Sequence, residues 1–335
     1  MRSSNRRVPE FAYSHTIGNV SFFRYPVSIA LGKDESFCVL NRGHDGDWIF
    51  GVSVVKTDET FVGKFGGYGD TDGRFIWPTS IVMDSEGLAY VSDEWLNRIS
   101  VFDTSVQFNG EDILEQNFLR KWGSSGSKDG QINGPSGMVL DEDENLYITE
   151  HVNHRVSKFS RNGNFIMTFG KEGSGPGEFN SPWGITINDF GEIFIADWGN
   201  NRVQQFTSDG TYMMTIGIPG SGSGKLHLPS DVAVDGDGDV YVSDWGQNKI
   251  EVYDATGDHL TTFYGDAQKL SKSGLNYLDL NISDNEKRKL VTDFGPEWRF
   301  NLPTAIEVDD IGRIFVADNV RMRVQIYSKK LCNNR

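Results

Sequence analysis

The chain has 335 residues, of which 37% are hydrophobic and 12% aromatic, and its formal net charge is −15 at pH 7. This charge excludes the basic surface that binding to a nucleic-acid backbone requires, and it disfavours docking to an anionic membrane surface. No apolar run in the sequence is long enough to span a bilayer, so we expect neither a nucleic-acid nor a membrane partner.

The N-terminal region and the cysteines bear on the compartment. Arg6 and Arg7 resemble the start of a twin-arginine export signal, but no hydrophobic segment follows them. The two cysteines, Cys38 and Cys332, are far apart in the sequence, which favours free thiols in a reducing compartment over a disulfide. We therefore expect a cytoplasmic protein.

Six copies of one sequence pattern organise the chain. Each copy begins with a proline, and a carboxylate or an asparagine follows fifteen residues later. In the last five copies a basic residue stands twenty residues after the proline. The prolines are Pro26, Pro78, Pro135, Pro182, Pro229 and Pro303; they are followed by Asn41, Asp93, Glu150, Asp197, Asp244 and Asp318, and the basic residues are Arg98, Arg155, Arg202, Lys249 and Arg323. Such regular spacing indicates a repeated structural unit.

Within a copy, the pattern predicts four antiparallel strands. Ile193 and Ile195 alternate with other residues at the period of two that is typical of half-buried strands. Turns rich in aspartate and glycine, such as 235–238, separate the apolar runs. Four strands in about 45 residues, repeated around a ring, describe one blade of a propeller. The sequence therefore predicts an all-β fold, a six-bladed β-propeller that forms a single domain over residues 1–335.

The sixth copy lacks a fourth strand, and the N-terminal segment supplies a replacement. Residues 13–18 resemble 212–217, the fourth strand of another copy, so we expect the N-terminal strand to complete the last blade and close the ring. The expected parts are 10–18 (closing strand of blade 6), 25–66 (blade 1), 77–123 (blade 2), 134–170 (blade 3), 181–217 (blade 4), 228–265 (blade 5), 266–301 (a short helical insertion) and 302–328 (blade 6).

Propeller topology assigns these segments to two faces. The first strand of a blade starts, and its second strand ends, on the same face. The prolines and the loops after the repeated acids therefore surround one mouth of the central channel. We expect the insertion 266–301 on this face, partly covering the mouth, and the tight Asp/Gly turns on the opposite face.

Two short motifs resemble the signature of the NHL repeat. They are Asn-His-Arg-Val at 153–156 and Asn-Asn-Arg-Val at 200–203, each preceded by an apolar run that ends in an acid. The resemblance extends over nearly the whole chain and implies a propeller fold. It leaves function open, because NHL propellers include enzymes and non-catalytic binding scaffolds.

The first copy is similar to a segment of peptidyl-hydroxyglycine amidating lyase, a six-bladed zinc propeller. Residues 41–48, Asn-Arg-Gly-His-Asp-Gly-Asp-Trp, match the arginine motif of that family, and the resemblance implies a catalytic role for Arg42. The zinc histidines of the family directly follow the prolines of blades 2, 4 and 6, where this chain has Thr79, Trp183 and Thr304. The resemblance therefore implies a shared site location without the zinc histidines.

The repeated acids recur in too many copies to be catalytic groups. We interpret them as structural carboxylates that accept bonds from backbone N–H groups of the following turn or pair with the downstream basic residue. Function is expected where the pattern breaks, and it breaks at Asn41 and Arg42. The Arg42 guanidinium either clamps a substrate carboxylate or pairs with Asp45 or Asp47 at the surface.

Four side chains expected on the channel face are candidate catalytic groups: Arg42, His151, His227 and Asp231. Arg42 would hold or polarise the substrate, His151 or His227 would transfer protons, and Asp231 would orient the histidine. The alternative for each histidine is a solvated loop residue. His154 belongs to the repeat signature and is interpreted as structural.

The candidate substrate-binding residues are Trp183, Trp298, Glu94 and His44. Trp183 and Trp298 do not repeat among the copies, so their rings are candidates for stacking on a ligand. Trp198 and Trp245 do repeat, and we expect them to pack between neighbouring blades. The cofactor stays open, with His227, Asp231 and His151 as candidate ligands of one divalent metal, zinc or calcium.

These features favour a small-molecule site at the channel mouth, with lyase or hydrolase chemistry on a polar, anionic substrate. The alternative is a non-catalytic scaffold that binds a protein partner through the same face. A deep pocket favours the first function, and a flat aromatic surface favours the second. The sequence does not decide whether the protein is an enzyme.

Overall fold

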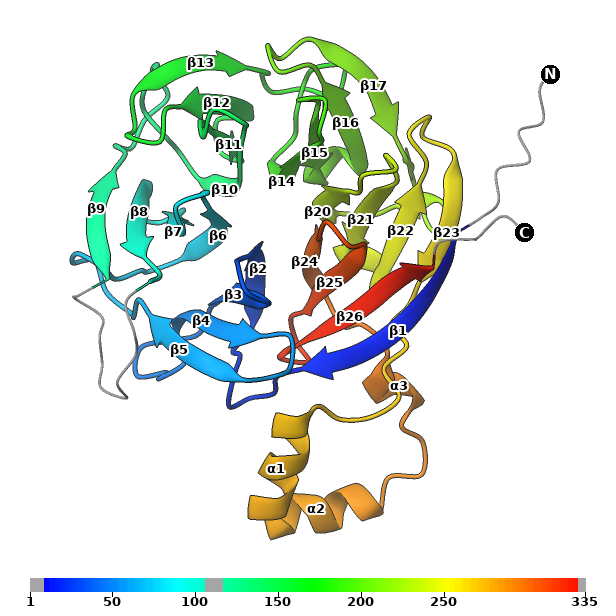
Figure 1. The fold of residues 1–335 in the computed structure, drawn as a ribbon. Helices are drawn as coiled ribbons and strands as arrows, with labels where there is room; N and C mark the ends of the chain where they lie inside the picture. Colours follow the sequence, from blue (N-terminus) through cyan, green and yellow to red (C-terminus); the bar gives the residue numbers. More distant parts are fainter. Residues whose placement is uncertain (1–8, 106–116, 331–335) are drawn as a thin grey trace, which may run out of the picture.

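The computed structural model describes residues 9–105 and 117–330, and these form six four-stranded antiparallel sheets around a central channel (Figure 1). Blade 1 consists of β2 (Pro26–Leu31), β3 (Ser36–Asn41), β4 (Gly51–Lys56) and β5 (Phe61–Phe65). Blade 2 consists of β6 (Pro78–Met83), β7 (Leu88–Asp93), β8 (Arg98–Asp103) and β9 (Phe118–Trp122). Blade 3 consists of β10 (Pro135–Leu140), β11 (Leu146–Glu150), β12 (Arg155–Phe159) and β13 (Phe165–Phe169). Blade 4 consists of β14 (Pro182–Ile187), β15 (Ile193–Asp197), β16 (Arg202–Phe206) and β17 (Tyr212–Ile216). Blade 5 consists of β20 (Pro229–Val234), β21 (Val240–Asp244), β22 (Lys249–Tyr253) and β23 (His259–Phe263). Blade 6 consists of β24 (Pro303–Val308), β25 (Arg313–Asp318), β26 (Arg323–Lys330) and β1 (Glu10–Ile17).

The predicted six-bladed fold and its mode of closure are confirmed. The N-terminal strand β1 pairs antiparallel with β26, from Glu10 opposite Lys330 to Ile17 opposite Val324. The first strand of every blade lies innermost, around the channel (Figure 1). Cys38 is buried, whereas Cys332 lies outside the described residues.

The apolar positions of each strand pack against the neighbouring blade. Between blades 1 and 2, for example, Phe65, Phe75 and Phe102 are fully buried, and the Phe65 and Phe102 rings lie 4.9 Å apart. The period of two in the sequence thus produces two buried faces for each sheet, one toward each neighbour. The hydrophobic core is therefore shared between blades around the whole ring.

The repeated acids are structural, as predicted. The Asp197 carboxylate accepts bonds from the backbone N–H of Asn180 (2.8 Å) and from Arg202 Nε (2.8 Å). Arg202 also donates to the carbonyls of Gly175 and Glu178, in the loop that leads into the same blade. One buried carboxylate therefore fastens both the incoming loop and the outgoing turn of its blade. Asp93, Glu150, Asp244 and Asp318 likewise accept a backbone N–H from the incoming loop. Arg155 and Arg323 also donate to the acid of their blade, whereas Arg98 donates to loop carbonyls.

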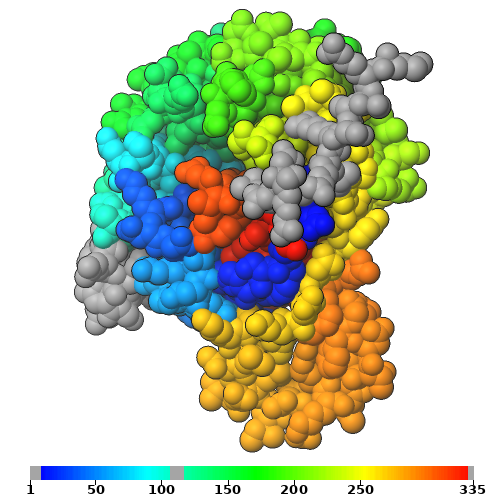
Figure 2. All heavy atoms as spheres, turned by 45° about the vertical axis from the view of Figure 1, so that its right-hand side comes forward, coloured from blue at the N-terminus to red at the C-terminus, as the bar shows by residue number. Residues whose placement is uncertain are grey.

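The insertion between blades 5 and 6 contains α1 (Lys272–Leu280), α2 (Ile282–Lys289) and α3 (Gly295–Trp298). It projects from the outer side of the propeller, beside β1, and does not cover the channel mouth (Figures 1 and 2). The expectation of a partly covered mouth is wrong because hydrogen bonds hold the insertion at the outer edge. Asn19 Nδ2 donates to the Ser273 carbonyl (2.8 Å), and the Glu59 carboxylate accepts from the backbone N–H groups of Lys272 and Ser273.

No helix in residues 9–105 and 117–330 is long and apolar enough to cross a membrane.

Two further short segments occur between blades 4 and 5, the parallel pair β18 (Ile218–Pro219) and β19 (Lys225–Leu226). Single 3-10 turns, η1 (Trp198–Asn200) and η2 (Trp245–Gln247), follow the second strands of blades 4 and 5. These turns bring a tryptophan to the channel face in each of the two blades.

The interior of the channel holds two neighbouring carboxylates, Asp231 and Glu307. Asp231 Oδ2 accepts a bond from the Ile306 backbone N–H (3.0 Å), and its backbone lies against Gly184 of the preceding blade, where a Cβ would come within 2.5 Å. Both residues lie on innermost strands, β20 and β24, and are partly exposed. Burial raises the pKa of Asp231 to about 7, and burial together with the Asp231 charge raises the pKa of Glu307.

Ring closure by β1 is expected to carry a measurable part of the stability. Ile17 is 0% exposed, so the change Ile17→Ala should lower the free energy of unfolding by about 2–5 kcal/mol, measured by urea denaturation. Ser14→Ala, at an exposed position of the same strand, is the control and should change it by less than about 0.5 kcal/mol. Equal small effects of both changes would show that β1 does not stabilise the ring.

Asp231→Asn is expected to remove a pH-dependent loss of stability. Because the folded-state pKa of Asp231 is raised from 3.8 to about 7, the folded protein holds a proton that the unfolded chain releases. Wild-type stability therefore falls as the pH rises through this window, and the asparagine variant lacks this contribution. Its stability relative to wild type should be greater at about pH 8 than at about pH 4.5 in urea denaturation. Asp310→Asn, at an exposed turn, is the control, and an equal difference at both pH values for Asp231→Asn would contradict the assignment.

Candidate functional site

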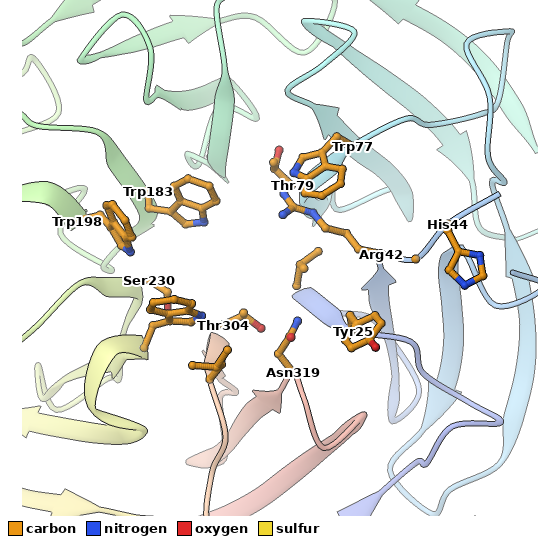
Figure 3. A pocket seen from close by; sticks show the side chains of 14 residues that line it. Tyr25, Arg42, His44, Trp77, Thr79, Trp183, Trp198, Ser230, Thr304 and Asn319 are labelled. Atoms are coloured by element: carbon orange, nitrogen blue, oxygen red, sulfur yellow. The ribbon is translucent and has the colours of Figure 1, made fainter.

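A cavity of about 540 Å³ lies at the channel mouth, on the face where the first strands start and the second strands end (Figure 3). Its lining residues are Tyr25, Val27, Arg42, Gly43, His44, Trp77, Thr79, Trp183, Trp198, Ser230, Trp245, Leu302, Thr304 and Asn319. We call this cavity the mouth pocket. Its residues come from every blade except blade 3, and the blade 3 residue His151 contacts its wall through Trp183.

In four blades the residue after the proline connects the blade to its neighbour. In blades 2, 3, 5 and 6 this residue is a serine or threonine whose hydroxyl donates to the proline carbonyl of the next blade. These bonds are Thr79 to Pro135 (2.7 Å), Ser136 to Pro182 (3.1 Å), Ser230 to Pro303 (2.9 Å) and Thr304 to Pro26 (2.7 Å). The hydroxyls around the channel are therefore used by the fold, and none is a free nucleophile in this geometry.

Arg42 replaces the missing hydroxyl of blade 1. Val27 stands after the proline there and cannot donate, and Arg42 Nε donates instead to the Pro78 carbonyl (2.7 Å). Its guanidinium carbon lies 4.7 Å from the centre of the Trp77 ring. Asp47 pairs with Arg24 (2.9 Å), so the alternative of a surface pair between Arg42 and Asp47 is wrong.

The terminal nitrogens of Arg42 remain available to a ligand. Within the described residues they have no hydrogen-bond partner, and Figure 3 shows the side chain directed toward Trp77 and Thr79. Burial lowers the pKa of Arg42 to about 10, against the opposing charges of Glu94 and Asp93. The guanidinium is therefore still charged at neutral pH, in partly desolvated surroundings.

Three tryptophans form an aromatic arc on the opposite wall of the mouth pocket (Figure 3). The ring centres of Trp183 and Trp198 are 6.4 Å apart, and those of Trp198 and Trp245 are 6.5 Å apart. Trp198 and Trp245 thus reach from blade to blade, as expected, and they also line the pocket. The arc offers a planar, apolar surface across the pocket from Arg42.

Glu94 and His151 lie next to each other beside this pocket. Glu94 Oε2 is 3.6 Å from His151 Nε2, and the His151 ring centre is 5.5 Å from that of Trp183. Burial raises the pKa of Glu94, with Arg42 opposing the rise. Burial, and then the charges of His154 and Arg42, lower the pKa of His151. His154 itself is structural, because its Nδ1 accepts the backbone N–H of Ser181 (3.0 Å).

The remaining candidate residues lie away from the centre of the pocket. His44 lies at its outer edge, where its Nδ1 is 3.0 Å from the Asp45 carbonyl (Figure 3). His227 is exposed and does not line the pocket, and Asp231 lies in the channel interior. Trp298 does not line it either, since its ring packs 6.1 Å from that of Phe294 within the insertion.

The three candidate metal ligands do not form one site. His151 lies beside the mouth pocket, His227 is exposed, and Asp231 bonds to the Ile306 backbone in the channel. In the part of the chain that the structure describes, no three His, Cys, Asp or Glu side chains are arranged to hold a metal ion. The hypothesis that His151, His227 and Asp231 bind a zinc or calcium ion together therefore does not fit this geometry.

One shared position escaped the sequence analysis. Arg42, Glu94, His151, Trp198, Trp245 and Asn319 all stand sixteen residues after the proline of their copy, directly after the repeated acid or asparagine. We call these six residues the mouth ring. The equal spacing was available in the sequence and predicts that Arg42, Glu94 and His151 come from corresponding places in three adjacent blades. Asn319 completes the ring, and its Nδ2 donates to the Pro26 carbonyl (2.9 Å).

Comparison with known proteins supports the fold. Residues 179–206 match the NHL repeat family. No curated protein sequence matches the chain significantly. Among solved structures, a catalytically inactive variant of virginiamycin B lyase from Staphylococcus aureus, with quinupristin, is similar with a TM-score of 0.58 and 14% identity, covering 95% of this chain and 99% of that one.

Two further solved structures are similar over most of the chain. A streptogramin B lyase has a TM-score of 0.59 and 11% identity, with 96% of this chain and 98% of that chain covered. A protein of unknown function from Bacteroides thetaiotaomicron has a TM-score of 0.60 and 16% identity, with 96% and 76% covered. At these identities the likeness is one of fold. Together with the six blades, it identifies the chain as a six-bladed β-propeller with an NHL repeat at residues 179–206.

Proposed function

We propose that the mouth pocket binds a small anionic molecule with a planar or aromatic part. The observation that carries this proposal is the state of Arg42. Its Nε is held by the Pro78 carbonyl, while its terminal nitrogens have no partner within the described residues and lie in the pocket wall. A guanidinium fixed in this way presents two parallel N–H donors, which match a carboxylate.

The surroundings of Arg42 strengthen its attraction for an anion. Among the lining residues that the structure describes, Arg42 carries the only permanent charge, and most of the others are apolar or aromatic. A charge-assisted hydrogen bond is stronger in such a place than in bulk water. The arc of Trp183, Trp198 and Trp245 supplies a face on which the planar part of the ligand stacks.

The chemistry that fits such a site is that of a lyase, with hydrolysis as the second candidate. In an elimination, a base takes a proton from the carbon next to the carboxylate, and the electron pair forms a double bond while the bond to the leaving group breaks. Arg42 would stabilise the charge that develops on the carboxylate, and His151 is the histidine placed near it. Lyase chemistry on this fold has a precedent in the virginiamycin B and streptogramin B lyases.

A protein partner on the same face is the alternative function. Trp95 is 73% exposed and Trp77 is 44% exposed, so aromatic surface extends beyond the pocket onto its rim. Exposed aromatic side chains are typical anchors of protein interfaces. The enclosed volume of about 540 Å³ favours the small molecule, because a pocket of this size accommodates a compact ligand.

The charge preference of the pocket is testable with two compounds of the same shape. In isothermal titration calorimetry, wild-type protein should bind phenylacetate roughly tenfold more tightly than phenylacetamide, because the carboxylate makes charged hydrogen bonds with Arg42. Arg42→Gln should remove this preference. The loss of the Pro78 bond should lower stability by about 1 kcal/mol, which a melting curve checks.

The matched control is Arg161→Gln, since Arg161 pairs with Glu144 and Glu86 away from the mouth. This variant should keep the wild-type preference. Equal affinity of the wild-type protein for the two compounds, or an unchanged preference in Arg42→Gln, would contradict the anion site. Binding of neither compound, with capture of a protein through Trp77 and Trp95, would favour the alternative function.

A further inference from the structure

Glu94 has a carboxylate oxygen whose bonding is incomplete. Its Oε2 is buried and has no hydrogen-bond partner, although the neighbouring carboxylate of Asp93 accepts four backbone N–H groups. The nearest polar group recorded for Glu94 Oε2 is His151 Nε2, at 3.6 Å. A buried carboxylate oxygen without a donor is costly, so this atom requires a proton or a bound donor.

The space around His151 is shaped for this contact. Gly134 stands directly before the proline of blade 3, and a Cβ there would come within 2.6 Å of His151 Nε2. The His151 ring occupies this space, and its other neighbours are Trp183 and Glu94. The glycine therefore allows the imidazole to lie close to Glu94 instead of pointing into solvent.

The surroundings of Glu94 and His151 determine how many protons the two side chains hold together. Burial disfavours both an imidazolium at His151 and a carboxylate at Glu94. The charges of His154 and Arg42 add to this effect at His151, whereas at Glu94 the Arg42 charge opposes burial and the Asp93 charge adds to it. With two protons the pair is cationic beside Arg42. With none, a neutral His151 can still donate its Nε2–H to Glu94, but the pair then carries a buried negative charge, which desolvation disfavours. With one proton the pair is satisfied and carries no net charge beside the Arg42 guanidinium.

We propose that Glu94 and His151 hold one proton between them and form the proton-transfer pair of the mouth pocket. The role in transfer rests on the proposed function, whereas the shared proton does not. In the elimination, the C–H bond breaks and its proton goes to His151 Nε2. The bond to the leaving group breaks with its electron pair, and the leaving group takes the proton that Glu94 holds. The pair thus ends with one proton, as it began.

Nuclear magnetic resonance of the histidine rings tests the shared proton without a substrate. The chain has 6 histidines, and the change His151→Gln assigns the His151 signal. In wild-type protein the His151 signal should shift in two steps. In the lower step His151 loses its proton, below the ordinary histidine pKa. In the upper step Glu94 loses its proton, above the ordinary glutamate pKa. Glu94→Gln should abolish the upper step and leave the lower one. A single identical step in wild type and Glu94→Gln would overturn the proposal.

Two controls keep this experiment decisive. Glu142→Gln, at an exposed turn on the opposite face, should leave both steps unchanged. Glu94→Asp keeps the charge but draws the carboxylate back from His151, so it should make the upper step smaller. If Glu94→Gln does not fold, Glu94→Asp serves as the test variant in its place. The signal of His44, at the outer edge of the pocket, should be the same in all variants.

Phenylacetate then tests the role in the pocket. When it is bound, its negative charge beside the pair should move both steps of the His151 signal to higher pH. Unchanged steps at saturating phenylacetate would mean that the ligand lies away from the pair, which would overturn the proton-transfer role. If phenylacetate does not bind, the anion site fails, but the comparison of wild type with Glu94→Gln still decides the shared proton.

Discussion

The buried carboxylate that ends the second strand of a blade is the interaction on which the rest of the structure depends. In blade 4, Asp197 accepts the Asn180 backbone N–H and Arg202 Nε, and so binds the incoming loop to the outgoing turn. Both segments lie at the channel mouth. In blade 1 the Asn41 amide oxygen takes the place of the carboxylate and accepts the Arg24 backbone N–H. Because this group fixes both segments, the side chain that follows it is held at the mouth in every blade. The mouth ring is a consequence of this constraint.

The same constraint separates fold from function within each copy. The proline, the acid and the basic residue are nearly invariant among copies because each serves the blade. The residue after the acid is free to differ, and it differs in every blade except 4 and 5, where tryptophan recurs. At this position blade 1 contributes Arg42 to the pocket, blades 2 and 3 place Glu94 and His151 beside it, and blades 4 and 5 contribute Trp198 and Trp245 of the aromatic arc. A charged side and an aromatic side thus face each other across one pocket.

The burial of these groups determines their chemistry. Arg42 is held by a backbone carbonyl and stays charged in partly desolvated surroundings. Burial raises the pKa of Glu94 and lowers the pKa of His151, and this shift of the two values toward each other favours proton transfer between the groups. Asp231 and Glu307 are also buried carboxylates, but they lie in the channel interior. Burial of these two carboxyl groups lowers the stability of the folded protein, and the other interactions of the fold offset this loss.

The sequence was sufficient for the fold and for part of the site. The spacing of proline and acid, the period of two and the likeness of 13–18 to 212–217 predict six blades closed by β1, because these features follow from local strand geometry. They also place Arg42 and Trp183 at the mouth. Repetition among copies predicts that Trp198 and Trp245 pack between blades, but it does not show that the same rings line the pocket.

The failures have long-range causes. The insertion was expected over the mouth, but Glu59 and Asn19, more than two hundred residues earlier, hold it at the outer edge. Trp298 belongs to this insertion and therefore lies away from the pocket. His227 and Asp231 flank one proline at distances that differ from the spacing of the mouth ring, and within the described residues they do not form a metal site with His151. The sequence pattern of a blade does not contain these contacts between distant segments.

A crystal structure of the protein soaked with phenylacetate tests the central claim most directly. The account predicts that the carboxylate lies on the terminal nitrogens of Arg42, with the ring against Trp183 and Trp198. It also predicts that Glu94 and His151 face the carbon next to the carboxylate. Phenylacetate bound elsewhere, or a mouth pocket without it at saturating concentration, would contradict the account.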